Sequence, residues 1–171
     1  MPVRQLYSPP QIQRSINRLA KQIAADYRGK PLILIGILRG GFIVLADLVR
    51  ALWLAGHHDL DIDFITTSSY LESNISAQVP PKIIVDLNRS LAGQHVLIVE
   101  DICDTGLTLN LVQKQLRAAG PKSLKTFTFL DKPSRRQVPV KLDYIGFTVN
   151  GWIEGYGLDA DRACPSVVVK T

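Results

Sequence analysis

The chain has 171 residues, 46% of them hydrophobic and 20% charged, which is typical of one globular domain and excludes a disordered chain. Two cysteines and three histidines exclude a disulfide scaffold and fall short of the usual zinc patterns. The net charge of +5 favours anionic partners, phosphorylated metabolites as well as nucleic acid. No apolar run approaches the roughly 18–20 residues of a membrane span, and no signal peptide opens the chain, so we expect a soluble cytoplasmic protein with no membrane partner.

The first part of the chain predicts helices and strands in alternation. Ser8 and the two prolines after it are typical of a helix start, and apolar residues spaced by four and three continue a helical stripe towards Gly29. Residues 32–38 are apolar without alternation, which is typical of a central parallel strand covered on both faces. A second helix is predicted over 42–52, and a strand over 60–70.

The second part of the chain continues this alternation. In chain order, the pattern predicts a loop over 71–81, a short strand over 82–87, a strong strand over 95–100, a loop over 101–106, a helix over 108–119, strands over 124–130 and 144–149, and a short β-rich tail over 152–171. Strands alternating with helices of this length indicate an α/β fold with a central parallel sheet.

The segment over residues 96–108 carries the candidate chemistry. A buried strand delivers Glu100 and Asp101, two adjacent carboxylates, to the sheet edge where open α/β proteins bind ligands. A turn rich in Asp, Thr and Gly then leads to Thr108 at a helix N-terminus, whose free N–H groups suit a phosphate. Carboxylates repel phosphate but accept hydrogen bonds from ribose hydroxyls and bind Mg²⁺. The segment therefore predicts a site for a phosphorylated sugar, whereas mere helix capping leaves the carboxylates unexplained.

Five segments together resemble the type I phosphoribosyltransferases, and most closely the hypoxanthine-guanine phosphoribosyltransferases. In chain order they are Leu38-Arg39-Gly40 (the pyrophosphate loop), Ser69-Tyr70 (the start of the mobile catalytic loop), 96–108 (the signature for phosphoribosyl pyrophosphate, PRPP), 130–136 (the purine-selecting lysine) and 152–159 (the stretch that holds the base). The resemblance implies a parallel sheet flanked by helices in one domain over 1–171. Its core would span about 30–150, and a small hood would form from about 1–12 and 150–171.

The resemblance also implies a role for each matching residue on the PRPP side. Glu100 and Asp101 would hold the ribose hydroxyls and, with Asp159, help to place Mg²⁺. Asp104 would act as general acid or base at N7 of the purine. The phosphate and pyrophosphate sites would consist of Asp104, Thr105, Gly106, Leu107 and Thr108 for the 5′-phosphate and of Arg39, Gly40 and Arg162 for the pyrophosphate.

On the base side, the resemblance implies that Lys132 donates a hydrogen bond to the 6-oxo group of the purine. Adenine has a donating amino group at that position, so the lysine would reject it. Trp152 would stack on the base, where the family usually has Phe or Tyr. The backbone of Ile153 and of Asp159 would address the edge of the base.

Several residues depart from the family pattern around the expected mobile loop. Ser69 and Tyr70 begin the loop that would close over PRPP and exclude water, but Leu71 follows where the family generally has Gly. Arg39 stands where the family usually has Lys, and the peptide bond before it is expected to be cis. The stretch before Arg162 is shorter than the family's.

The implied reaction is transfer of the 5-phosphoribosyl group from PRPP to N9 of hypoxanthine or guanine, with Mg²⁺, in a homodimer or homotetramer. Two alternatives remain open. One is a transferase that prefers xanthine, and the other is a regulatory protein on the same scaffold that binds PRPP, a nucleotide or RNA. The lysines and arginines are scattered rather than gathered in one basic stripe, which disfavours a nucleic-acid partner.

Overall fold

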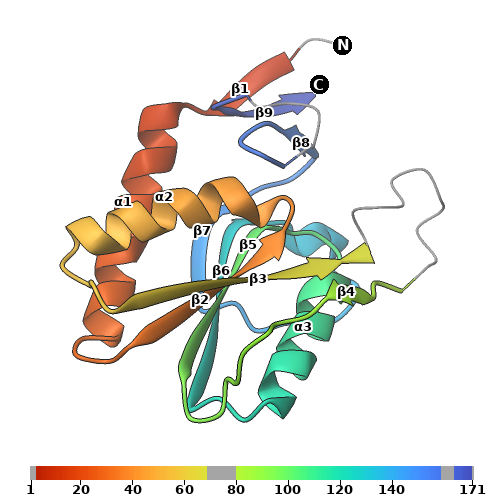
Figure 1. Ribbon diagram of the computed structural model, residues 1–171. Helices are drawn as coiled ribbons and strands as arrows, with labels where there is room; N and C mark the ends of the chain where they lie inside the picture. The colour runs from red at the N-terminus through yellow and green to blue at the C-terminus, as the bar shows by residue number, and fades with distance from the viewer. Residues whose placement is uncertain (1–2, 69–79, 159–163, 171) are drawn as a thin grey trace.

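A six-stranded sheet forms the body of the protein in this computed structural model, which describes residues 3–68, 80–158 and 164–170 (Figure 1). The strand order is β4-β3-β2-β5-β6-β7, and all neighbours are parallel except β4, which pairs antiparallel with β3 at one edge. The strands are β2 (Leu32–Leu38), β3 (Leu60–Thr67), β4 (Ile83–Val85), β5 (His95–Cys103), β6 (Ser123–Asp131) and β7 (Tyr144–Thr148). The predicted α/β fold class is thereby confirmed.

Helices cover both faces of this sheet. Helices α1 (Pro9–Asp26) and α2 (Gly41–Leu54) pack on one face, and α3 (Leu107–Ala118) packs on the other (Figure 1). The apolar run of β2 is buried because its alternate residues enter the two cores. Leu34 packs with α1 and α2, whereas Ile35 packs with α3. Within the described ranges, no helix is long and apolar enough to cross a membrane.

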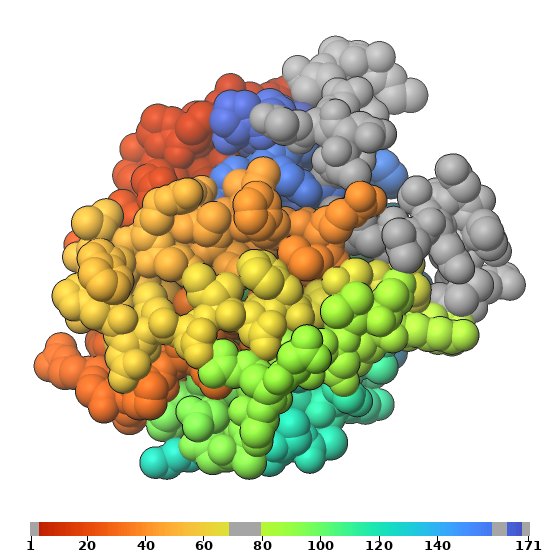
Figure 2. Space-filling view, in the orientation of Figure 1, coloured from red at the N-terminus to blue at the C-terminus, as the bar shows by residue number. Residues whose placement is uncertain are grey.

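A second, three-stranded sheet joins the two ends of the described chain. It consists of β1 (Val3–Tyr7), β9 (Val167–Lys170) and β8 (Trp152–Glu154) in that order, with antiparallel pairing throughout. The red and blue segments of Figure 2 meet accordingly at one end of the molecule. The ring of Tyr7 stacks on that of Phe147 in β7, with 3.8 Å between centroids, and fastens this sheet to the main one. The sequence predicted the β-rich tail but not β1; the division into core and hood stays a prediction.

The central strand β5 is longer than predicted. The sequence indicated a loop from Asp101 onwards, but β5 continues to Cys103 because β6 offers partners as far as Asp131. The backbone N–H of Lys132 extends the contact by donating to the carbonyl of Cys103 at 3.0 Å. Asp101 therefore lies within a strand, beside Glu100, and both side chains are buried.

Candidate functional site

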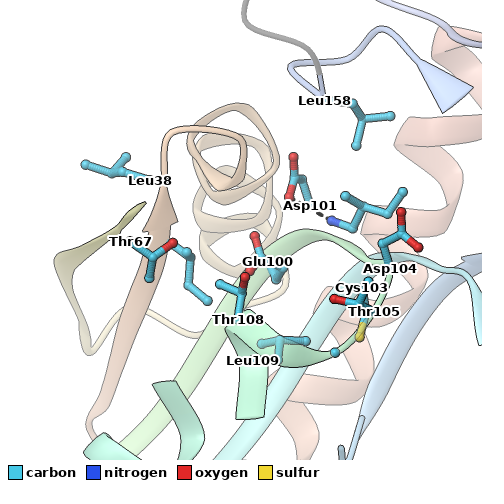
Figure 3. Close-up of a pocket in the computed structure, with 13 residues that line it drawn as sticks. Leu38, Thr67, Glu100, Asp101, Cys103, Asp104, Thr105, Thr108, Leu109 and Leu158 are labelled. Atoms are coloured by element: carbon cyan, nitrogen blue, oxygen red, sulfur yellow. Dashed lines mark hydrogen bonds between the residues drawn. The ribbon is translucent and has the colours of Figure 1, made fainter. Parts of the chain in front are cut away.

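A cavity of about 340 Å³ opens at the carboxyl ends of the central parallel strands (Figure 3). Its floor comes from the ends of β2, β3 and β5 and from the turn into α3, and Leu158 faces this floor from the side of the second sheet. The lining residues are Ile37, Leu38, Thr67, Glu100, Asp101, Ile102, Cys103, Asp104, Thr105, Gly106, Thr108, Leu109 and Leu158. The cavity thus includes most of the predicted PRPP signature.

The two neighbouring carboxyls of β5 are the most unusual feature of this cavity. Burial raises the pKa of Glu100 well above its usual range, and the negative charge of Asp101 raises it further. Burial also raises the pKa of Asp101. One carboxyl oxygen of Asp101, Oδ1, accepts a hydrogen bond from the backbone N–H of Ile102 at 2.7 Å. Among the described residues, none donates to its buried Oδ2. The pair therefore suits hydroxyl donors or a cation from a ligand.

These two carboxyls fit a Mg²⁺ ion that is shared with substrate and water. Within the described ranges, no group of three or more His, Cys, Asp or Glu side chains could hold a metal by itself. Mg²⁺ ordinarily keeps several waters and uses one or two protein carboxylates, so two buried acids meet its usual demand.

The turn between β5 and α3 is shaped by Gly106. Its φ of +85° lies in the left-handed region that favours glycine. A Cβ at this position would lie 2.8 Å from Cδ of Arg136 and 3.0 Å from the carbonyl oxygen of Val138. The hydroxyl of Thr105 accepts a hydrogen bond from the N–H of Leu107 at 3.4 Å. Among the described residues, Gly106 is the cap residue of α3 and supplies no side-chain cap to the helix, which suits phosphate binding at this turn.

Asp104 lies between two cationic side chains beyond the end of β6. Its carboxylate oxygens are 3.6 Å from Nζ of Lys132 and 3.0 Å from Nε of Arg135. Lys132 is only 4% exposed, so it is not an ordinary surface lysine. Arg136 pairs instead with Asp131. Because β5 and β6 are parallel neighbours, their ends bring the acidic and basic residues to one edge of the sheet.

Other predicted site residues lie outside the cavity lining. Arg39 and Gly40 follow β2, and the peptide bond between Leu38 and Arg39 is cis, as predicted. Trp152 and Ile153 belong to β8; the indole of Trp152 is 59% exposed and donates to Oε1 of Glu154 at 2.9 Å. Five predicted residues lie outside the described residues, namely Ser69, Tyr70, Leu71, Asp159 and Arg162.

Some contributors to the site were not predicted. Thr67 is buried at the end of β3, and its position at the carboxyl end of a strand was the available signal. Leu158 reaches the cavity from the turn after β8; it belongs to the predicted base-binding stretch 152–159, but no role had been assigned to its side chain. The ion pair between Arg135 and Asp104 also went unpredicted. Cys103 lines the cavity as a buried thiol, and its burial raises its pKa to about 12, which keeps it protonated and inert.

Comparison with known proteins assigns the family. A sequence model of the phosphoribosyl transferase domain matches residues 2–161, and the chain belongs to this family. The hypoxanthine phosphoribosyltransferase of Escherichia coli (strain K12) is 42% identical over 152 residues, which cover 87% of this chain and 83% of that protein. The hypoxanthine-guanine phosphoribosyltransferase of Bacillus subtilis (strain 168) is 39% identical over 157 residues, covering 90% and 83%. The resemblance to these enzymes is thus confirmed.

Solved structures agree with this assignment. A hypoxanthine-guanine phosphoribosyltransferase from Bacillus anthracis covers both chains completely, with a TM-score of 0.86 and 35% identity. The hypoxanthine phosphoribosyltransferase of Trypanosoma cruzi, solved in complex with its product IMP, has a TM-score of 0.86 and 39% identity and covers 96% of this chain and 92% of that one.

Because Glu100 is buried, replacing it by an uncharged side chain should stabilise the fold by an amount that depends on pH. The pKa of Glu100 is higher in the folded state than in the unfolded state. Below the unfolded-state pKa the carboxyl is uncharged in both states, and as the pH rises above that value the fold loses stability. We expect Glu100→Gln to raise Tm near pH 8 by about 2 °C or more, and the gain to vanish near pH 4. Thermal unfolding in EDTA at the two pH values measures this. An equal shift at both, or a lower Tm near pH 8, would contradict it.

Proposed function

We propose that the protein is a purine salvage transferase that moves the 5-phosphoribosyl group from PRPP to N9 of hypoxanthine or guanine. The products are IMP or GMP and pyrophosphate. The observation that carries the proposal is the meeting of a buried acidic pair, a glycine turn into a helix and the Lys132–Asp104 ion pair at one sheet edge, in a chain of the phosphoribosyl transferase family. The names of the relatives and the IMP complex of the Trypanosoma cruzi structure support it.

The transfer requires one bond to break and one to form at the anomeric carbon. The C1′–O bond breaks and the leaving pyrophosphate takes the electron pair, while N9 forms the new bond to C1′. The purine must also lose a proton, and Asp104 is the proposed acceptor, acting at N7 as general base. Lys132 and Arg135 hold its carboxylate from two sides at 3.6 Å and 3.0 Å.

The remaining groups bind and orient PRPP. Glu100 and Asp101 would hold the ribose hydroxyls and Mg²⁺, and the ion would supply positive charge for the pyrophosphate. The turn from Asp104 to Thr108 takes the 5′-phosphate at the N-terminus of α3. The proposed pyrophosphate contacts are Arg39, Gly40 and Arg162, and the proposed closing loop begins at Ser69 and Tyr70.

Base selection is assigned to Lys132 and the second sheet. The buried ammonium of Lys132 donates to a 6-oxo group but would meet another donor in adenine. Trp152 is exposed enough to stack on a purine, and the backbone of Ile153 and Asp159 would meet the edge of the base. We place the reaction in the cytoplasm and in a homodimer or homotetramer.

The direct test is turnover by the purified protein with PRPP, Mg²⁺ and each of hypoxanthine, guanine, xanthine and adenine. We expect nucleotide formation with hypoxanthine or guanine, none with adenine, and loss of turnover when EDTA removes the metal. A preference for xanthine would correct the substrate. PRPP binding without turnover, together with salt-dependent RNA binding, would replace the enzyme by a regulatory protein.

Asp104→Asn tests the proton acceptor. The amide keeps the shape of the side chain but cannot take a proton, so we expect kcat to fall by about 10²–10⁴-fold while KM for PRPP changes little. Asp59→Asn, at an exposed carboxylate, serves as the matched control. A kcat for Asp104→Asn near that of the control would remove Asp104 from this role.

Lys132→Met tests base selection, because it keeps an unbranched side chain and removes the donor. We expect the ratio of kcat/KM for hypoxanthine to that for adenine to fall at least about tenfold. The exposed Lys122 gives the control, Lys122→Met, which should leave the ratio unchanged. Steady-state kinetics with both bases measures the ratio, and an unaltered value in Lys132→Met would argue against the lysine.

A further inference from the structure

The segment after β8 makes an unusually tight turn over Gly155, Tyr156 and Gly157. All three residues have positive φ, at +89°, +53° and +85°, and Tyr156 is the one non-glycine residue with positive φ in the described part of the chain. A Cβ at Gly155 would lie 2.1 Å from the carbonyl oxygen of Ser166. The backbone at this tyrosine is therefore strained, and the surrounding structure holds it in that conformation.

The side chain of Tyr156 is held by two contacts, one of its ring and one of its hydroxyl. It is 6% exposed, and its ring packs against Phe129 of β6 with 5.0 Å between centroids. Its hydroxyl donates to Oδ2 of Asp47 in α2 at 2.6 Å. Burial and this acceptor both raise the pKa of Tyr156, so the hydroxyl remains a donor at working pH. Arg50 holds the other oxygen of Asp47 at 3.0 Å.

Helix α2 links this anchor to the PRPP side of the cavity. The helix begins at Gly41, immediately after the proposed pyrophosphate loop. A Cβ on Gly41 would lie 3.1 Å from the carbonyl oxygen of Val99, the residue before Glu100, so the helix start is pressed against β5. On the other side of the Tyr156–Asp47 hydrogen bond, Leu158 lines the cavity two residues beyond Tyr156 (Figure 3).

We propose that Tyr156 and Asp47 form a positioning pair that sets the distance between the base-binding segment 152–158 and the PRPP side of the cavity. The inference rests on the proposed function, and neither residue touches the reacting atoms. Transfer requires N9 to approach C1′ in line with the leaving group, and a misplacement of about 1 Å can cost about 10²-fold in rate. The hydroxyl of Tyr156 holds that spacing by connecting the turn after β8 to the helix that follows the pyrophosphate loop.

Tyr156→Phe removes the hydroxyl and keeps the packed ring. We expect kcat/KM for hypoxanthine to fall about tenfold or more, while KM for PRPP stays within about twofold. Asp47→Ala should have the same effect, Asp47→Asn a smaller one because it keeps an acceptor oxygen, and the double variant Tyr156→Phe/Asp47→Ala no greater loss than either single change.

Tyr144→Phe is the matched control. Its hydroxyl also donates to an aspartate, Oδ2 of Asp26, at 2.6 Å, but it lies at the first residue of β7, at the amino ends of the strands and away from the cavity. Both variants should lower Tm, whereas only Tyr156→Phe should change the kinetics of the base. The same kinetic change in both variants, or an equal loss for hypoxanthine and PRPP, would show a merely structural bond and overturn the inference.

Binding separates this inference from the proposed function. IMP spans the base and phosphate sites, whereas ribose 5-phosphate occupies only the phosphate side. Calorimetry should show Tyr156→Phe weakening IMP about tenfold and ribose 5-phosphate less than twofold. If the wild type binds both ligands without turnover, the proposed function fails. The ratio of the IMP affinity to the ribose 5-phosphate affinity, compared between Tyr156→Phe and the wild type, then still tests the positioning role of Tyr156 and Asp47. An unchanged ratio of the two affinities overturns the pair even in an active enzyme.

Discussion

The burial of two adjacent carboxyls in β5 is the constraint on which the site depends. A buried, unpaired carboxylate costs several kcal/mol, and the burial of these two neighbouring groups accordingly raises the pKa of both. No ion pair to Glu100 or Asp101 forms among the described residues, whereas Asp104 nearby pairs with Lys132 and Arg135. This absence of an internal counter-charge is what supports the proposal that the strand binds a cation or a set of hydroxyls from a ligand.

The parallel arrangement of the sheet converts this local feature into a site. β5 lies between β2 and β6, so three carboxyl ends converge around it. The end of β2 contributes the basic loop before α2, and the end of β6 contributes Lys132 and its two arginine neighbours. Each of these segments is remote from the others in sequence. Their acidic and basic side chains come together because parallel strands align their carboxyl ends at one edge of the sheet.

The sequence predicted what depends on local pattern. The unbroken apolar run of β2, the carboxylates at the end of a strand and the turn at Gly106 each carry their own signal within a few residues. What depends on long-range contact was not predictable in this way. β1 is short and forms because β9 lies beside it, β5 extends to Cys103 because β6 continues alongside, and Leu158 reaches the cavity through the turn at Tyr156. The ion pair of Asp104 with Arg135 likewise required the register of two strands.

The order β1-β9-β8 has a consequence for how the protein is made. β8 contains Trp152 and, among the described strands, pairs with β9 alone; β9 is itself the middle strand between β8 and β1. During synthesis the elements up to β7 emerge first and already contain the acidic pair, the turn and Lys132. The segment assigned to the base finds its backbone partner only when β9 has been made and can pair with β8 and with β1, the first strand of the described chain. The residues proposed for the sugar phosphate can therefore assemble before the segment proposed for the purine has its partner strand.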